Sequence, residues 1–313
     1  MPESKNGNSL KTGSTSPIPS LQRRGVGALS SRLLAPFARR FIAGTTLTDA
    51  LEVLKRLKTQ GFATTLDHLG ESVTSISEAK MATEQYLVML RALKEKDLDR
   101  NISVKLTQLG LNIDKELCIE NLERIVHAAE EIHGFVRVDM ESSKETQATL
   151  DVIRRIKRNR AVPLGATVQS MLFRTPEDIV DLVQREIPLR LCKGAYKESP
   201  EIAHRDMRII RKELLSQAKR LLTSRLYHGI ATHDTWLIEE IQRFAKYQNI
   251  DPERFEFQLL LGIRTRLAKR ILADGWRVRI YVPFGHMWLP YTWRRLRERK
   301  ENMWFFIKNL FIR

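Results

Sequence analysis

Two adjacent arginines near the C-terminus, Arg294 and Arg295, have the type and spacing to bind an anion. On a predicted helix, Tyr291 lies one turn before the pair and Glu298 one turn after it. Two neighbouring guanidinium groups form a planar fork that suits a carboxylate. An arginine pair alone is typical of any basic helix. This pair, however, closely follows an apolar stretch at 277–282 that ends in a Pro/Gly turn, so the preceding elements must show whether it belongs to a site.

The composition describes an ordinary globular protein. The 313 residues are 42% hydrophobic and 29% charged, which is enough for one large domain or two small ones with a sizeable core. No run of 18 apolar residues predicts a transmembrane helix. Cys118 and Cys192 provide neither a disulfide framework nor metal-ligand spacing, so a reducing compartment and no metal site are predicted.

The formal net charge is +16, and the excess is concentrated at the C-terminus, where residues 264–313 contain 13 Lys and Arg but three acidic residues. Such a segment attracts an anionic cofactor, an anionic membrane surface or nucleic acid. No zinc-finger or RNA-binding motif accompanies it, and a nucleic-acid partner is therefore disfavoured.

The chain divides into three predicted parts. Residues 1–27 are rich in Ser, Gly, Asn and Pro and are expected to be a disordered lead without a secretory signal. Residues 28–61 are expected to form N-terminal helices, namely a short basic amphipathic helix at 29–43 and a second helix at 48–59. Residues 62–313 form the third part.

This third part alternates short apolar strands with helices. Strands are predicted at 62–66, 102–106, 135–139, 164–169, 189–193, 230–233, 255–259 and 277–282. The helices that follow them are predicted at 75–97, 115–132, 144–158, 176–185, 201–225, 235–247, 265–274 and 287–311. Eight such units in about 250 residues predict a TIM-type (β/α)8 barrel with extra N-terminal helices. No G-x-G-x-x-G follows the first strand, which disfavours a Rossmann dinucleotide site.

Polar residues recur at the predicted carboxyl ends of these strands, where barrel active sites are built. They are Asp67, Lys105, Asp139, Gln169, Arg190 with Lys193, His233, Gln258 and the arginines after the last strand. Each alone is explained by an ion pair or a helix cap, and Asp234 is the better cap of the helix at 235–247. Together, on seven strands, they indicate a site. Gly194 and Ala195, directly after a strand, permit close approach of a cofactor beside Lys193.

These residues lie in motifs that resemble the proline dehydrogenase family, and the length and lack of a second domain resemble its monofunctional branch. The motifs run in family order through nearly all of the predicted barrel. They are Leu66-Asp-His-Leu-Gly-Glu71, Ile102-Ser-Val-Lys-Leu-Thr107, Val138-Asp-Met140, Arg190-Leu-Cys-Lys-Gly-Ala-Tyr196, Ala231-Thr-His233, Phe255-Glu-Phe-Gln258, Tyr281-Val-Pro-Phe-Gly285 and Tyr291-Thr-Trp-Arg-Arg-Leu-Arg-Glu298.

The resemblance implies a distorted (β/α)8 barrel that binds FAD. It implies oxidation of L-proline to Δ1-pyrroline-5-carboxylate, with a hydride passing from proline C5 to flavin N5 and the electrons passing to membrane quinone. The implied downstream partner is a pyrroline-5-carboxylate dehydrogenase. The implied location is cytoplasmic, peripherally at the inner membrane (the mitochondrial matrix side in a eukaryote), with membrane contact through the basic C-terminal segment.

The resemblance also implies roles for individual residues. Lys105, Arg294 and Arg295 would hold the proline carboxylate, and Glu298 would orient an arginine. The remaining roles are as follows: Tyr281 and Leu260 wall the proline ring, Asp139 and Arg190 are catalytic, and Met140, Gln169, Lys193, Gly194, Ala195, Thr232 and His233 contact the flavin. Asp139 is expected to align Lys105 with the substrate, and Arg190 to act as a cation near flavin N5.

The chain departs from the family pattern at a few positions. Leu261 precedes Gly262 where the family often has Tyr or His, and His286, Met287 and Leu289 replace residues that are often acidic or aromatic. Two alternatives therefore stay open. One is a dehydrogenase for hydroxyproline or another cyclic imino acid, although Tyr281 would crowd a ring hydroxyl. The other is an inactive barrel that acts as a basic membrane-binding or nucleic-acid-binding scaffold.

Overall fold

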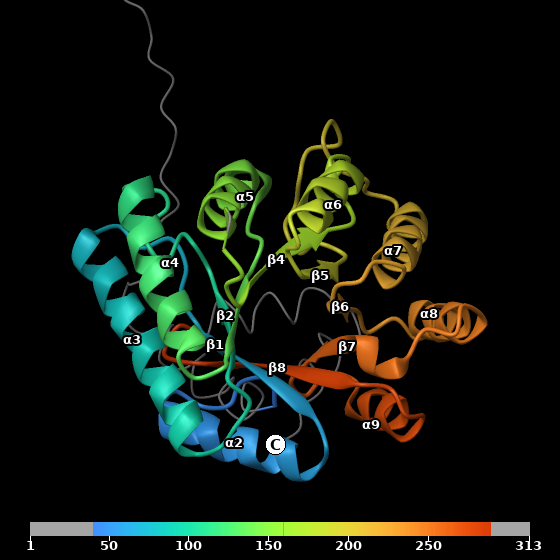
Figure 1. Ribbon diagram of the computed structural model, residues 1–313, viewed down its shortest axis with the longest axis horizontal. Coiled ribbons are helices and arrows are strands. Elements are labelled where there is room, and N and C mark those ends of the chain that lie inside the picture. Colours follow the sequence, from blue (N-terminus) through green and yellow to red (C-terminus); the bar gives the residue numbers. More distant parts are fainter. Residues whose placement is uncertain (1–39, 159, 289–313) are drawn as a thin grey trace, which may run out of the picture.

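The computed structural model describes residues 40–158 and 160–288, which form a closed barrel of eight parallel strands ringed by helices (Figure 1). The strands pair in sequence order, and β1 closes the barrel against β8. They are β1 (Ala63–His68), β2 (Asn101–Val104), β3 (Phe135–Val138), β4 (Leu164–Gln169), β5 (Leu189–Cys192), β6 (His228–Ala231), β7 (Phe255–Leu260) and β8 (Val278–Phe284). The (β/α)8 prediction is confirmed.

The helices alternate with these strands. They are α2 (Leu47–Thr59), α3 (Ile76–Glu95), α4 (Lys115–Glu130), α5 (Ser143–Lys157), α6 (Thr175–Gln184), α7 (Met207–Leu222), α8 (Thr235–Tyr247) and α9 (Thr265–Ala273), with a 3-10 turn, η1 (Pro252–Arg254), before β7. Several begin at a side chain that accepts hydrogen bonds from the first turn. Ser75 and Glu78 form a capping box at α3, and Asp234 caps α8 as predicted.

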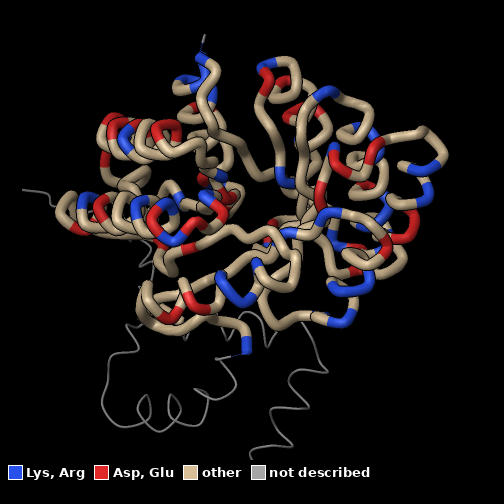
Figure 2. The backbone as a smooth tube through the Cα atoms, turned by 60° about the horizontal axis from the view of Figure 1, so that its bottom comes forward, with Lys and Arg blue, Asp and Glu red and all other residues tan. Residues whose placement is uncertain are grey.

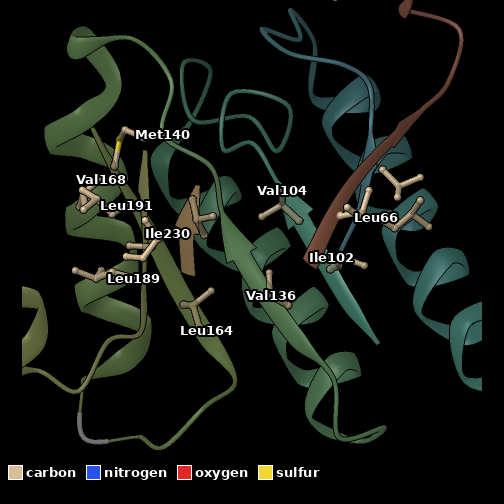
Figure 3. Packing of buried hydrophobic residues seen from close by; sticks show 14 of the residues in the cluster. Leu66, Ile102, Val104, Val136, Met140, Leu164, Val168, Leu189, Leu191 and Ile230 are labelled. Atoms are coloured by element: carbon tan, nitrogen blue, oxygen red, sulfur yellow. The ribbon is translucent and has the colours of Figure 1, made fainter. Parts of the chain in front are cut away.

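The hydrophobic core lies between the strands and the surrounding helices. Leu66, Ile102, Val136 and Leu164 belong to this layer, and Figure 3 shows how such aliphatic side chains line the strands. Alternate residues on the same strands face the barrel interior. There the side chains are polar, and this places hydrogen-bonding groups directly beneath the carboxyl ends of the strands.

The N-terminal part of the described chain covers the seam where the barrel closes. Helix α2 contacts both β1 and β8. Just before it, the Ala43 amide donates to the Pro283 carbonyl at 2.9 Å, and the Gly285 amide donates to the Gly44 carbonyl at 3.0 Å. Phe41 belongs to a small apolar cluster against which Leu260 packs. This segment therefore supports the end of β7, where Leu260 lies.

Two predicted starts differ from the structure by two residues or more. Helix α7 begins at Met207 rather than 201, because Asp206 caps it and the preceding loop forms an isolated antiparallel bridge between Leu172 and Ala203. Strand β6 begins at His228 rather than 230. His228 is polar but buried, because its ring accepts from the Leu189 amide and bonds to the Ser224 hydroxyl.

Several predictions fall wholly or largely outside the described residues. The lead at 1–27 and almost all of the helices at 29–43 and 287–311 are among them. Residues 40–43, which are described, form a turn and a bend rather than helix. Basic and acidic residues are interspersed over the outer helices (Figure 2). Between residues 40 and 288, leaving out residue 159, no helix is long and apolar enough to cross a membrane.

The barrel interior tolerates no side chain at Gly165 on β4. A Cβ there would lie 2.5 Å from the Pro188 carbonyl oxygen and 2.4 Å from the Arg137 guanidinium. We expect Gly165→Ala to lower the free energy of unfolding by about 1–3 kcal/mol through overpacking, measured by urea denaturation. Gly275→Ala provides a comparison without overpacking. A Cβ there meets nothing within 4 Å, so this variant measures only the backbone strain of a residue with φ +86°. Unchanged stability of Gly165→Ala would contradict the prediction.

Candidate active site

A cavity of 730 Å³ opens at the carboxyl ends of the strands. It is lined by all twelve predicted site residues that the structure describes. These are Lys105, Asp139, Met140, Gln169, Arg190, Lys193, Gly194, Ala195, Thr232, His233, Leu260 and Tyr281. The remaining three, Arg294, Arg295 and Glu298, lie outside the described residues and stay predictions.

Arg190 bonds across the barrel rather than along its wall. It is the second residue of β5 and 5% exposed, so the prediction that it lies at a strand end is wrong. Its Nε donates to Gln258 Oε1 on β7 at 2.5 Å, and one Nη donates to the Ser103 hydroxyl on β2 at 3.1 Å. Its other Nη donates to Asp139 Oδ1, just after β3. Since β2, β3 and β7 are not neighbours of β5, these bonds fill the barrel interior.

Asp139 is held by partners on both carboxylate oxygens. Arg190 binds Oδ1, while the Tyr281 hydroxyl donates to Oδ2 at 2.7 Å. The Arg190 guanidinium also lies over the Tyr281 ring, 5.2 Å from its centre. Burial, with the negative charges of Asp139 and Asp67, raises the pKa of Tyr281 well above its ordinary value. Tyr281 therefore stays neutral and keeps its donor proton.

Lys105 lies between two carboxylates at the end of β2. Its Nζ is 2.8 Å from Asp67 Oδ1 and 3.7 Å from Asp139 Oδ2. Burial acts to lower the pKa of Lys105, but Asp67 and Asp139 outweigh it, and the pKa lies well above the ordinary lysine value. Lys105 is therefore a permanent cation at the wall of the cavity.

The turn after β5 brings backbone close to the cavity. Gly194 has φ +110°, and a Cβ there would lie 2.5 Å from the Met171 sulfur, so glycine is needed both for the conformation and for the space. Gln169 at the end of β4 donates through Nε2 to the Glu141 carbonyl at 3.1 Å. Thr167, on the same strand, is 4% exposed and its hydroxyl has no partner within the described residues.

Beside the neighbouring strand β6, polar groups gather around the start of α8. His233 Nε2 accepts from the Leu260 amide at 2.9 Å, so this nitrogen carries no proton. Asp234 caps α8 and is paired with Arg211, whose guanidinium lies over the Trp236 ring. Arg211 and Arg264 both line the cavity here, and their guanidinium groups suit a phosphate group.

Comparison with known proteins decides the family. A family model described as proline dehydrogenase matches residues 50–307. The chain belongs to the proline dehydrogenase family. This confirms the prediction that the chain belongs to this family and is a proline dehydrogenase enzyme.

Relatives and solved structures agree with this assignment. Proline dehydrogenase 1 of Bacillus subtilis subsp. natto is 37% identical over 273 residues, covering 87% of this chain and 90% of the relative. The proline dehydrogenase of Deinococcus radiodurans is 30% identical over 293 residues, covering 92% and 94%. The crystal structure of proline utilization A from Bdellovibrio bacteriovorus, inactivated by N-propargylglycine, is similar with a TM-score of 0.80 and 26% identity. That match covers 88% of this chain but 34% of the larger protein.

Within this proline dehydrogenase family fold, the structure adds partners that the sequence did not assign. The nearest partner of Lys105 is Asp67, which was noted at a strand end without a role, and Asp139 is the more distant one. Ser103 and Glu256 were missed. The sequence did contain a signal for both residues. Ser103 lies two positions before Lys105, and Glu256 lies two positions before Gln258. Residues two apart on a strand point to the same face, here the barrel interior.

The raised pKa of Tyr281 predicts how alkali affects the protein. The folded pKa lies above the unfolded value of about 10, so the stabilisation from neutral Tyr281 is complete below pH 10 and is lost as the pH rises above it. We expect tyrosinate absorbance from Tyr281, obtained as the difference between the unaltered protein and Tyr281→Phe, to appear only as circular dichroism reports unfolding. A difference that develops near pH 10 in the folded protein would contradict this.

Proposed function

We propose that this chain oxidises L-proline to Δ1-pyrroline-5-carboxylate with FAD as its cofactor. The observation that carries the proposal is the fixed cation Lys105 beside the Asp139–Arg190 ion pair, at the inner end of a 730 Å³ cavity, in a chain of the proline dehydrogenase family. A scaffold that had lost activity would not need to hold buried charges at a cavity wall, since buried ion pairs are weak sources of stability.

The substrate end of the cavity supports recognition of a small cyclic amino acid. Lys105 offers its ammonium group to the carboxylate, and Tyr281 and Leu260 form apolar walls for the ring. The predicted fork of Arg294 and Arg295 would bind the same carboxylate in two places, with Glu298 orienting an arginine.

The other walls fit a flavin with a pyrophosphate tail. Met140, Gln169, Lys193, Gly194, Ala195, Thr232 and His233 are the proposed contacts. Three observations support the fit: backbone at Gly194 lines the cavity directly after β5, the buried Thr167 hydroxyl lacks a partner among the described residues, and Arg211 and Arg264 offer positive charge beside the start of α8. The cationic group of Lys193 adds to this set.

In the proposed reaction, the cofactor and the residues of the chain have separate roles. FAD, when bound, would accept at N5 the hydride that leaves C5 of proline, as the amine gives up a proton and the carbon–nitrogen double bond forms. Lys105 holds the substrate by its carboxylate. Asp139, with no free oxygen, acts as a fixed anchor between Tyr281 and Arg190 rather than as a mobile base. Arg190 supplies a buried positive charge that favours electron gain nearby.

We further propose that the electrons pass on to membrane quinone and that the protein binds peripherally, from the cytoplasmic side, to the inner membrane. The product would pass to a pyrroline-5-carboxylate dehydrogenase. The net charge of +16, concentrated in residues 264–313, supports the membrane contact, because a cationic segment favours an anionic lipid surface.

The proposal is tested by the visible spectrum of the purified protein before and after anaerobic L-proline. We expect a flavin band that bleaches with proline, and whose recovery is faster with a quinone in anionic vesicles than in zwitterionic ones. A flavin band that bleaches only with hydroxyproline would move the activity to that substrate. No flavin binding after reconstitution with FAD would contradict the proposal.

Lys105 is expected to contribute to proline binding through one charge-assisted contact. Lys105→Met, made in an Asp67→Asn background so that no carboxylate is left buried alone, should raise KM for proline and lower kcat/KM by about 10–100-fold, as for a lost bond of about 1.5–3 kcal/mol. The control is Asp67→Asn alone, which keeps the ammonium group. Equal KM values for the two proteins would show that the carboxylate binds elsewhere.

A further inference from the structure

Beneath the cavity, one buried carboxylate joins the charged side chains of the barrel interior. Glu256 on β7 is 2% exposed and does not line the cavity. Its Oε1 accepts from Arg279 Nε and from Gln258 Nε2, each at 2.6 Å, and its Oε2 accepts from the Tyr227 hydroxyl at 2.8 Å. Glu256 thus lies one layer below Gln258, which bonds directly to Arg190.

The charge of Glu256 decides which way the Gln258 amide points. Burial acts to raise the pKa of Glu256, but Arg279 and the hydrogen bonds outweigh it, so the pKa is lowered and the group is ionised. An ionised carboxylate only accepts hydrogen bonds, so the NH2 group of Gln258 must face it. The Gln258 oxygen is then left for Arg190 Nε. The reversed amide would place oxygen against carboxylate and NH2 against guanidinium.

The neighbouring strand, β6, has a glycine where the Gln258 amide needs space. Gly229 on β6 pairs with Glu256, and a Cβ on Gly229 would lie 2.3 Å from Gln258 Nε2. Unlike Gly194, Gly229 does not have a positive φ, so the backbone would accept alanine. The space that the Gln258 amide occupies therefore explains the glycine.

We propose that Glu256 is a positioning residue for the reaction: through Gln258 it holds the Arg190 guanidinium, and with it Asp139, in the orientation that the site uses. Arg190 divides its donors among Gln258, Ser103 and Asp139, so a turned Gln258 amide would leave Nε unpaired and release the guanidinium to rotate. The inference rests on the proposed function, because proline oxidation is one of its readouts. The competing explanation is that Glu256 only neutralises the buried Arg279.

A matched pair of variants separates the two explanations. Glu256→Leu/Arg279→Leu removes the buried ion pair and the acceptor for Gln258 together, and replacing both charges by apolar groups limits the loss of stability. Glu256→Gln/Arg279→Leu removes the same charges but keeps a carbonyl oxygen at Oε1 as an acceptor for Gln258 Nε2. The two proteins differ only at residue 256, in whether that acceptor is present.

The measurements are the limiting rate of anaerobic flavin bleaching by proline, the Kd for cyclopentanecarboxylate, which has the ring and carboxylate but no amine, and urea denaturation. We expect the Leu/Leu protein to bleach at least about 10-fold more slowly than the Gln/Leu protein, as for a lost bond to a charged group, with similar Kd values. Equal bleaching rates in these two proteins would overturn the proposal. Failure of the unaltered protein to bleach with proline would instead contradict the proposed function.

Crystal structures of the same pair decide the point without any substrate. The Arg190–Asp139 bond should be lost or displaced in the Leu/Leu protein and kept in the Gln/Leu protein, and an unmoved guanidinium in both would overturn the proposal. Gly229→Ala is an independent variant that changes no charge. It should displace the Gln258 amide and slow bleaching similarly, whereas Tyr227→Phe, which removes only the bond to Oε2, should leave the rate nearly unchanged.

Discussion

The buried bond between Arg190 and Asp139 is the interaction on which the rest of the site depends. Arg190 is 5% exposed, and its guanidinium is stable there only if its donors are satisfied, since an unpaired buried charge is strongly destabilising. The partners come from three other strands, β2, β3 and β7. The register of all three strands relative to β5 must therefore be correct at the same time. Closure of the barrel in strict sequence order provides this register. The fold and the site are therefore specified by the same pairings.

Filling a barrel with charged side chains requires space that an apolar barrel would not leave. The usual interior of this fold is built from layers of branched aliphatic residues. Here Arg137 and Gln258 occupy space beside Gly165 and Gly229, where even a Cβ would clash. The aliphatic residues of the strands face the helices instead (Figure 3), and the hydrophobic core is a ring around a polar centre.

The sequence predicted the elements and the strand ends well, because alternation of short apolar runs with helices depends only on local pattern. It predicted less of the interior. Arg190 was assigned to a strand end, yet it lies in mid-strand, because a charged residue inside a barrel can be recognised only when its partners on distant strands are known. Likewise, His228 interrupted the apolar pattern of β6 and shifted the predicted start of the strand, although its ring is fully bonded. Asp67 was visible, but its pairing with Lys105 depends on the β1–β2 register.

The charges described around the substrate position are already balanced. Lys105 and Arg190 carry two positive charges, and Asp67 and Asp139 carry two negative ones within the same network. The carboxylate of an amino acid would add a negative charge to this neutral group, and Lys105 alone could not compensate for it while paired with Asp67. Further positive charge at the cavity would therefore stabilise a bound carboxylate. The adjacent arginines 294 and 295, which follow the last strand in the sequence and lie outside the described residues, remain the predicted source of this charge, because two neighbouring guanidinium groups suit a carboxylate.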